Sequence, residues 1–141
     1  MHLQAKAYAA FFEQLHAGMK KQEYARFFDA SSVFEDPFQS VQGLDSIYGV
    51  FEHMYKTLCE SAFFVEECIS EKNVTFLRWR FVYKRLHVSM QESFIGVSRV
   101  TFGENGKVLS HVDYWDAAYN VYEKVPLLGA ILRFIKRKIR A

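Results

Sequence analysis

The residues best suited to acid–base chemistry lie in two short segments, Asp36 before Pro37 and His111 to Asp113 near the end of the chain. Side chains of a β-strand alternate between its faces, so His111, Asp113 and Trp115 share one face of the strand predicted there. Two carboxylates in an apolar cavity tend to differ in protonation state, and a neighbouring imidazole can stabilise the charged one or carry a proton. Asp36, His111 and Asp113 are therefore candidate catalytic residues for proton transfer without a metal.

Each of these residues also has a purely structural explanation. An Asp beside a proline commonly accepts hydrogen bonds within a turn. His111 and Asp113 could bind only each other, or pair with Arg78 or Arg80 across the sheet. The sequence leaves both interpretations open.

Other classes of site find little support in the chain. The five His are scattered, without the spacing of a metal site, and no G-x-S-x-G nucleophile motif or glycine-rich phosphate loop occurs. We therefore expect no metal, no nucleotide or other cofactor and no covalent catalysis.

Helices followed by long strands are the elements that must position these groups. Apolar spacing predicts helices over residues 3–17, 22–29 and 44–58. A brief strand over 31–34 is expected to end at the turn containing Pro37, and Pro126 is expected to begin a last helix that ends near Arg140. Alternating spacing predicts four further strands, over residues 62–70, 73–86, 89–102 and 107–116. This order predicts an α+β domain with helices against a curved antiparallel sheet.

Composition agrees with a single folded domain. Of the 141 residues, 50% are apolar and 17% aromatic, which excludes a disordered chain and allows a core without disulfides. So many aromatic residues suggest a cavity lined by aromatic rings, although a solid aromatic core would give the same composition. Cys59 and Cys68 lack a C-x-x-C spacing and no signal peptide precedes them, so we expect reduced thiols in a cytoplasmic protein.

The net charge of +2 divides unevenly along the chain. Residues 124–141 carry six basic and no acidic residues, which leaves twelve basic and sixteen acidic residues before them. An acidic body argues against nucleic acid as a partner.

Three motifs give the chain a resemblance to a known superfamily. They are Val33-Phe34-Glu35-Asp36-Pro37 followed by Gly43, then Phe102-Gly103-Glu104-Asn105-Gly106-Lys107-Val108, then Asp113-Tyr114-Trp115-Asp116. In order and spacing, residues 1 to about 122 resemble the nuclear transport factor 2-like superfamily, which includes ketosteroid isomerases and SnoaL-like polyketide cyclases. The resemblance implies a cone-shaped domain over residues 1–123, followed by a basic helix over 124–141.

The resemblance also implies a site. Asp36 aligns with the general base of ketosteroid isomerase, and the face that carries His111 and Asp113 turns toward a cavity between helices and sheet. The expected ligand-binding residues are Phe11, Trp79, Phe81, Tyr83, Phe94, Ser98 and Trp115. In ketosteroid isomerase a tyrosine and a protonated aspartate donate hydrogen bonds to the enolate oxygen. The tyrosine position falls here at Phe11 or Phe12 and the aspartate position at Ser98. Because both donors are missing, steroid isomerisation is not assigned.

These observations lead to two alternative functions. The first is a metal-independent isomerase or cyclase, in which Asp36 is the base, His111 and Asp113 are the acid or orient it, and Ser98 or Tyr83 contacts the oxygen of an apolar carbonyl or hydroxyl compound. The second is a non-catalytic ligand-binding or protein-interaction domain. In both cases we expect a homodimer.

The last predicted helix has an apolar stripe beside a basic stripe. Three uses are open: packing on the domain or on a partner subunit, a lid over the cavity, and docking on an anionic membrane surface.

Overall fold

Two helices begin the chain, α1 (His2–Gln14) and α2 (Lys21–Ala25). In the computed structural model, which describes residues 2–141, α1 turns one face into the core and buries Tyr8, Phe11 and Phe12. α2 is shorter than the predicted helix over 22–29, because the chain is already extended at Phe28, which begins the first strand and is fully buried.

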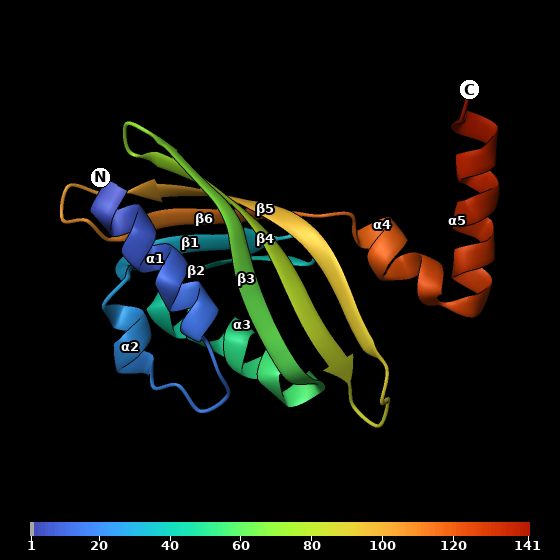
Figure 1. The fold of residues 1–141 in the computed structure, drawn as a ribbon, viewed down its shortest axis with the longest axis horizontal. Helices are drawn as coiled ribbons and strands as arrows, with labels where there is room; N and C mark the ends of the chain where they lie inside the picture. Colours follow the sequence, from blue (N-terminus) through green and yellow to red (C-terminus); the bar gives the residue numbers. More distant parts are fainter. Residues whose placement is uncertain (1) are drawn as a thin grey trace.

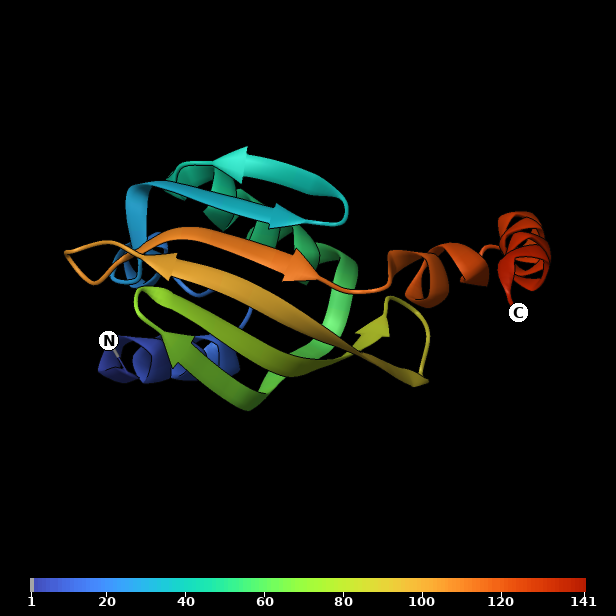
Figure 2. The same ribbon diagram turned by 90° about the horizontal axis from the view of Figure 1, so that it is seen from above.

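The strands form one curved, six-stranded sheet in the order β2-β1-β6-β5-β4-β3 (Figure 2). Their bounds are β1 (Phe28–Asp36), β2 (Gln39–Gln42), β3 (Leu58–Glu71), β4 (Val74–Arg85), β5 (Gln91–Phe102) and β6 (Val108–Tyr114). The helix α3 (Leu44–Thr57) connects β2 to β3. β1 ends at the turn that contains Pro37, where proline cannot donate to a ladder.

Two features of the sheet differ from the prediction. β2 was not predicted, because it has four mostly exposed residues and no apolar alternation. The pair β1–β6 is parallel, whereas every other neighbouring pair is antiparallel, so the sheet is mixed. Parallel pairing is possible because α3 and four strands separate β1 from β6 in the chain, which removes the hairpin constraint.

The N-terminal helices and α3 cover the concave face of the sheet (Figure 1). α1 packs against β3, and α3 packs against β1 and α2. The core between these layers is largely aromatic, and ring contacts join Tyr8, Phe12 and Phe51 across three elements. The α+β cone fold predicted from the sequence is therefore confirmed.

A C-terminal extension follows β6. It consists of α4 (Ala117–Asn120), a 3-10 turn η1 (Tyr122–Lys124) and α5 (Pro126–Ile139). The last helix was predicted, whereas α4 and η1 are too short to show a periodic pattern. α5 contacts η1 and stands away from the sheet at the end opposite to α1 (Figure 1). No helix within residues 2–141 is both long and apolar enough to cross a membrane.

Candidate functional site

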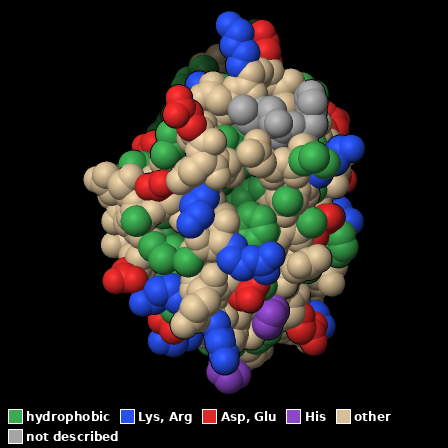
Figure 3. Space-filling view, turned by 90° about the vertical axis from the view of Figure 1, so that its left-hand side faces the viewer, with side chains coloured by type: hydrophobic (Ala, Val, Ile, Leu, Met, Phe, Trp, Pro, Cys, Tyr) green, Lys and Arg blue, Asp and Glu red, His purple; other side chains and the backbone are tan. Residues whose placement is uncertain are grey.

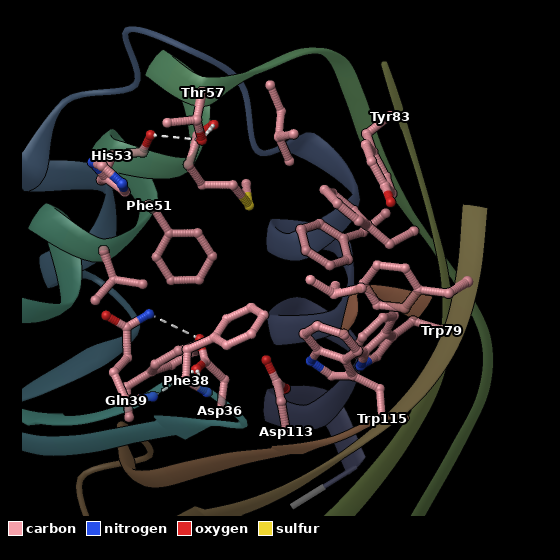
Figure 4. A pocket seen from close by; sticks show the side chains of 18 of the residues that line it. Asp36, Phe38, Gln39, Phe51, His53, Thr57, Trp79, Tyr83, Asp113 and Trp115 are labelled. Carbon is pink, nitrogen blue, oxygen red and sulfur yellow. Dashed lines mark hydrogen bonds between the residues drawn. The ribbon is translucent and has the colours of Figure 1, made fainter. Parts of the chain in front are cut away.

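A cavity of about 420 Å³ lies between α3, the concave face of the sheet and the segment that follows β6 (Figure 4). Its wall is mainly apolar. α3 contributes Val50, Phe51, His53, Met54 and Thr57, and β4 contributes Trp79, Phe81, Tyr83 and Arg85. Such a volume falls within the range of pockets that hold drug-sized ligands.

Five of the seven predicted ligand-binding residues line this cavity. Trp79, Phe81 and Tyr83 alternate along β4 and therefore face the same side. Phe94, from β5, and Trp115, which directly follows β6, stack with ring centroids 4.4 Å apart. Together they form an aromatic wall opposite α3.

Asp36 lines the cavity and also closes the turn after β1. Its Oδ1 accepts hydrogen bonds from the backbone N–H groups of Phe38 (2.8 Å) and Gln39 (3.0 Å), and its Oδ2 accepts one from the Gln39 amide (3.0 Å). The turn role that the sequence left open is therefore observed. Both oxygens of Asp36 are engaged within this turn.

Asp113 is bound differently. Its side chain is only 13% exposed and points into the cavity (Figure 4). Oδ1 lies 2.6 Å from His111 Nε2 and 2.5 Å from Ser98 Oγ, whereas no described residue forms a hydrogen bond with Oδ2. One carboxylate oxygen is therefore fixed by the protein, and the other is available to a ligand.

His111 supports Asp113 from behind the cavity wall. Its ring is 1% exposed and stacks with Phe12 and Phe34, at centroid distances of 5.1 and 4.9 Å. Of these residues only Phe34 lines the cavity, and His111 does not. The structure thus places the predicted histidine beside Asp113 but not among the residues that line the cavity.

The contact with Tyr8 defines the tautomer of His111. The Tyr8 hydroxyl lies 2.8 Å from His111 Nδ1, and burial, assisted by the negative charge of Asp113, raises the pKa of Tyr8 well above its usual value. The hydroxyl therefore keeps its proton and needs an acceptor, because an unpaired buried donor is costly. We assign Tyr8 O–H as donor to Nδ1 and His111 Nε2–H as donor to Asp113.

Ser98 makes the second contact to Asp113. It is 1% exposed, and the Trp79 indole N–H donates to its Oγ at 2.8 Å. Its own proton is then directed to Asp113 Oδ1. Ser98 therefore holds Asp113 and is not among the residues that line the cavity, so its contact with a ligand oxygen stays a prediction.

Phe11 is the other predicted residue that lies elsewhere. It points into the packing between α1 and α2, where its ring stacks on Phe27 at 4.5 Å and meets Tyr24 at 5.4 Å. Phe12, its neighbour, turns toward His111 instead. Consecutive residues of a helix face different directions, so only one of the two can lie over His111.

Sequence reasoning missed Tyr8 and the contribution of α3. Tyr8 precedes Phe12 by one helical turn and therefore shares its face, a signal that was present in the sequence. In α3, Val50, Met54 and Thr57 follow helical spacing, so the face was recognisable as apolar but not as a cavity wall.

An ion-pair cluster joins the cavity rim to the C-terminal extension. Glu92 contacts Arg85 Nε at 2.5 Å and Lys124 Nζ at 2.6 Å, and its side chain is 11% exposed. Burial alone would raise the pKa of Glu92, but hydrogen bonds from Lys124 and Arg85 lower it overall. Arg85 also lines the cavity. Within residues 2–141 no group of three His, Cys, Asp or Glu side chains is arranged to hold a metal ion.

Comparison with solved structures shows the same fold. A protein with a ketosteroid isomerase-like fold from Catenulispora acidiphila DSM 44928, in complex with trimethylamine, has a TM-score of 0.71 at 12% identity, covering 88% of this chain and 92% of that one. TerC co-crystallised with polyporic acid has a TM-score of 0.71 at 13% identity, covering 84% and 92%.

A candidate SnoaL-like polyketide cyclase from Jannaschia sp. CCS1 has a TM-score of 0.70 at 12% identity, covering 83% of this chain and 88% of that one. At such identities the likeness concerns the fold alone. A search of curated proteins finds no significant match.

Sequence comparison identifies the family more directly. The family model described as a SnoaL-like domain matches residues 5–111, a range that begins in α1 and ends within β6 at His111. The match includes most of the strands and helices that form the cavity. The chain therefore belongs to the SnoaL-like domain family.

Proposed function

We propose that the cavity binds an apolar small molecule that carries a carbonyl or hydroxyl group, and that Asp113 exchanges a proton with it. The observation that carries this proposal is the asymmetry of Asp113. Oδ1 receives hydrogen bonds from His111 and Ser98, while no residue within 2–141 forms a hydrogen bond with Oδ2, which lies at an aromatic cavity wall. A carboxylate held in this way is oriented for proton transfer.

The reaction would begin at a carbon next to the carbonyl of the ligand. Asp113 Oδ2 takes the proton, and the electron pair of the broken C–H bond moves to the carbonyl oxygen to form an enolate. In an isomerase, Asp113 returns the proton to another carbon. In a cyclase, the enolate carbon attacks a second carbonyl group, a C–C bond forms, and the new alkoxide takes the proton from Asp113.

Two residues have supporting parts in this reaction. His111 donates to Asp113 throughout and fixes its orientation, so it is a positioning residue. Tyr83 lines the cavity, and its hydroxyl forms no hydrogen bond within residues 2–141. Burial and the charge of Glu92 raise the pKa of Tyr83. Its hydroxyl therefore remains a donor at neutral pH and would serve the developing enolate oxygen.

Asp36 is the competing candidate for the base, because the superfamily resemblance assigns it that role. Its two oxygens already accept three hydrogen bonds from the turn, which leaves it less able to take a proton from a ligand. We therefore assign the base to Asp113 and keep Asp36 as a wall residue. Comparing the two Asp→Asn variants separates these assignments.

The experiment uses deuterium exchange because it needs no knowledge of the natural product. A panel of apolar ketones is first screened for quenching of the fluorescence of Trp79 and Trp115, which both line the cavity. Ketones that bind are incubated in D₂O with the protein, and NMR measures deuterium at the carbon next to the carbonyl. Asp113→Asn should abolish the exchange while ketone binding persists, and Asp36→Asn should retain most of it.

Two outcomes would contradict the assignment. If Asp36→Asn abolishes exchange and Asp113→Asn does not, the base is Asp36. If the wild-type protein binds ketones but catalyses no exchange with any of them, the cavity belongs to a non-catalytic ligand-binding domain. A non-catalytic ligand-binding domain is therefore the second candidate function. It is favoured by the hydrogen bonds of Asp113 with His111 and Ser98, which would serve a structural role even without catalysis.

Oligomeric state and location are further predictions. A homodimer and a cytoplasmic location rest on the family resemblance and on the cysteine usage. Sedimentation velocity tests the first, and cell fractionation tests the second.

A further inference from the structure

An ordinary surface helix packs its apolar side against the protein, whereas α5 does the reverse. Its polar side faces the rest of the protein, where Arg133 donates to the Glu123 carbonyl at 3.0 Å and Lys136 binds the Glu123 carboxylate at 2.5 Å. Gly129 lies on the same side and is buried, and a Cβ there would come within 2.0 Å of the Glu123 carbonyl oxygen. η1 is thus held against the polar side of α5.

The apolar side of α5 consequently faces solvent. We call it the outer face. It consists of Leu127, Leu128, Ile131, Phe134, Ile135 and Ile139, whose exposed fractions range from 39% to 79%. A continuous patch of six large apolar side chains on a single projecting helix is unusual for a surface that is meant to stay in water.

The charges next to the outer face are almost entirely positive. No acidic residue occurs from Lys124 to the end of the chain. Lys124, Arg133 and Lys136 are engaged by Glu92 and Glu123, whereas within residues 2–141 no ion pair involves Arg137, Lys138 or Arg140. At the far end of the molecule, around α1, acidic and basic side chains are interspersed instead (Figure 3). At 100° per residue, Lys138 lies within the outer face and Arg137 lies 60° beyond Phe134, whereas Arg140 falls on the opposite, polar side.

Lys138 distinguishes between two possible occupants. At 100° per residue, it projects between Ile131 and Phe134 on the outer face, and its ammonium lies 5.5 Å from the centre of the Phe134 ring. A second protein copy packed on this face would bury that ammonium, which is costly without a carboxylate partner. At a lipid surface, the long side chain can extend to the headgroups while its methylene groups stay in the apolar layer.

We propose that the outer face of α5 binds the surface of an anionic lipid bilayer. The fourteen residues of α5 span about 21 Å, less than the roughly 30 Å apolar thickness of a bilayer, so the helix lies in the plane of the membrane. Its apolar side chains enter the acyl boundary, and Lys138 and Arg137 contact lipid phosphate and carboxylate groups. This proposal is independent of the chemistry assigned to Asp113.

Membrane binding would bring the cavity close to the lipid. Val121, between α4 and η1, lines the cavity, and Lys124 is held to the rim by Glu92. The extension that carries α5 therefore meets the rim through Val121 and through the Lys124–Glu92 ion pair. An apolar ligand dissolved in the bilayer would have a short path into the cavity.

Flotation of the full chain with lipid vesicles tests the proposal. The protein should bind vesicles of phosphatidylcholine mixed with phosphatidylserine, bind those of phosphatidylcholine alone much more weakly, and dissociate as salt is raised. The double variant Ile131→Ser/Phe134→Ser should bind at least about tenfold more weakly, since burying one such side chain is worth about that factor. The matched control Leu3→Ser changes an exposed apolar residue on α1 and should bind like wild type.

The charges are tested separately. Arg137→Gln and Lys138→Gln should each weaken binding to the anionic vesicles by about fivefold, the contribution of one cation near such a surface. Circular dichroism should show that all variants fold, because none of these side chains lies in the core.

Two results would overturn the proposal. One is the absence of binding to anionic vesicles at low salt while α5 is folded. The other is a dimer in sedimentation velocity that Ile131→Ser/Phe134→Ser dissociates, without vesicle binding in the wild type. The second result would assign the outer face to another copy of this chain.

Discussion

Tyr8 and His111 are separated by 103 positions in the chain, yet the Tyr8 hydroxyl lies 2.8 Å from His111 Nδ1. Both side chains are 1% exposed. The contact joins the first helix to the last strand and continues through His111 Nε2 to Asp113 at the cavity wall. The orientation of the candidate base therefore depends on packing between the two ends of the cone domain.

Removing the Tyr8 hydroxyl should destabilise the fold. Tyr8→Phe leaves Nδ1 of His111 without a donor in a place that water does not reach, which costs about 1–3 kcal/mol in the free energy of unfolding. Urea denaturation measures the change. Tyr24→Phe is the matched control, because Tyr24 is 2% exposed and its hydroxyl forms no hydrogen bond within residues 2–141. Equal losses in the two variants would contradict the assigned role of the Tyr8–His111 contact.

Ser98→Ala should affect both stability and the site. The change removes a donor to Asp113 and leaves the Trp79 indole N–H unpaired. The free energy of unfolding should therefore fall by about 1–3 kcal/mol. Deuterium exchange of a bound ketone should also slow, since Asp113 loses one of its two fixed contacts. Ser93→Ala, on an exposed position of β5, should change neither quantity. Exchange at the wild-type rate in Ser98→Ala would show that Ser98 does not position the base.

Gly96 should not tolerate a side chain. It pairs with Trp79 across β4 and β5, and a Cβ at Gly96 would lie 2.3 Å from the nearest ring carbon of Trp79. Gly96→Ala should therefore displace the indole from the cavity wall and cost about 1–3 kcal/mol, as overpacking usually does. Thermal unfolding and the Trp emission maximum report both effects.

Gly49→Ala is the matched control for this clash. Gly49 lies inside α3, where a Cβ would meet nothing within 4 Å. Alanine there should stabilise the protein by up to about 1 kcal/mol, because glycine is a poor helix former. If Gly96→Ala proved as stable as wild type, the close approach of Trp79 would be contradicted.

Stability should decline in alkaline solution. Burial raises the pKa of Tyr55 from 10.0 to about 12 and raises those of Tyr8 and Tyr24 as well. The unfolded chain then loses tyrosine protons more readily than the folded one, so stability is complete below pH 10 and falls as the pH rises through 12. Urea midpoints measured over this range should fall, and the fall should be smaller in Tyr8→Phe than in Tyr119→Phe, whose parent residue is exposed.

Much of the local structure could be predicted from the sequence. Alternation along β4 predicts that Trp79, Phe81 and Tyr83 share a face, and the structure places all three in the cavity wall. The same rule predicts a common face for His111, Asp113 and Trp115, of which Asp113 and Trp115 line the cavity. Such predictions succeed because the geometry of a strand is set by its own backbone, whatever surrounds it.

Positions across the domain could not be predicted in this way. Counting along the first helix leaves Phe11 and Phe12 as alternatives, and the packing of α1 against the sheet turns Phe12 and Tyr8 toward His111. His111 and Ser98 face the expected side of the sheet. However, the rings of Phe12 and Phe34 stack on His111. Ser98 is hydrogen-bonded to Trp79 and Asp113. A pattern of apolar residues does not indicate which side chain fills a given space.

The sequence by itself determined the α+β fold, the turn at Asp36 and the amphipathic nature of α5, because each depends on residues close together in the chain. Only the tertiary structure decided that Asp113, rather than Asp36, keeps a free carboxylate oxygen at the cavity, and that α5 turns its apolar side to solvent. Both results depend on contacts that are not visible in the sequence. In the first, Ser98 and His111 hold Asp113, and in the second, Glu123 holds α5. Local periodicity does not encode such contacts, because they depend on how the packed elements are oriented.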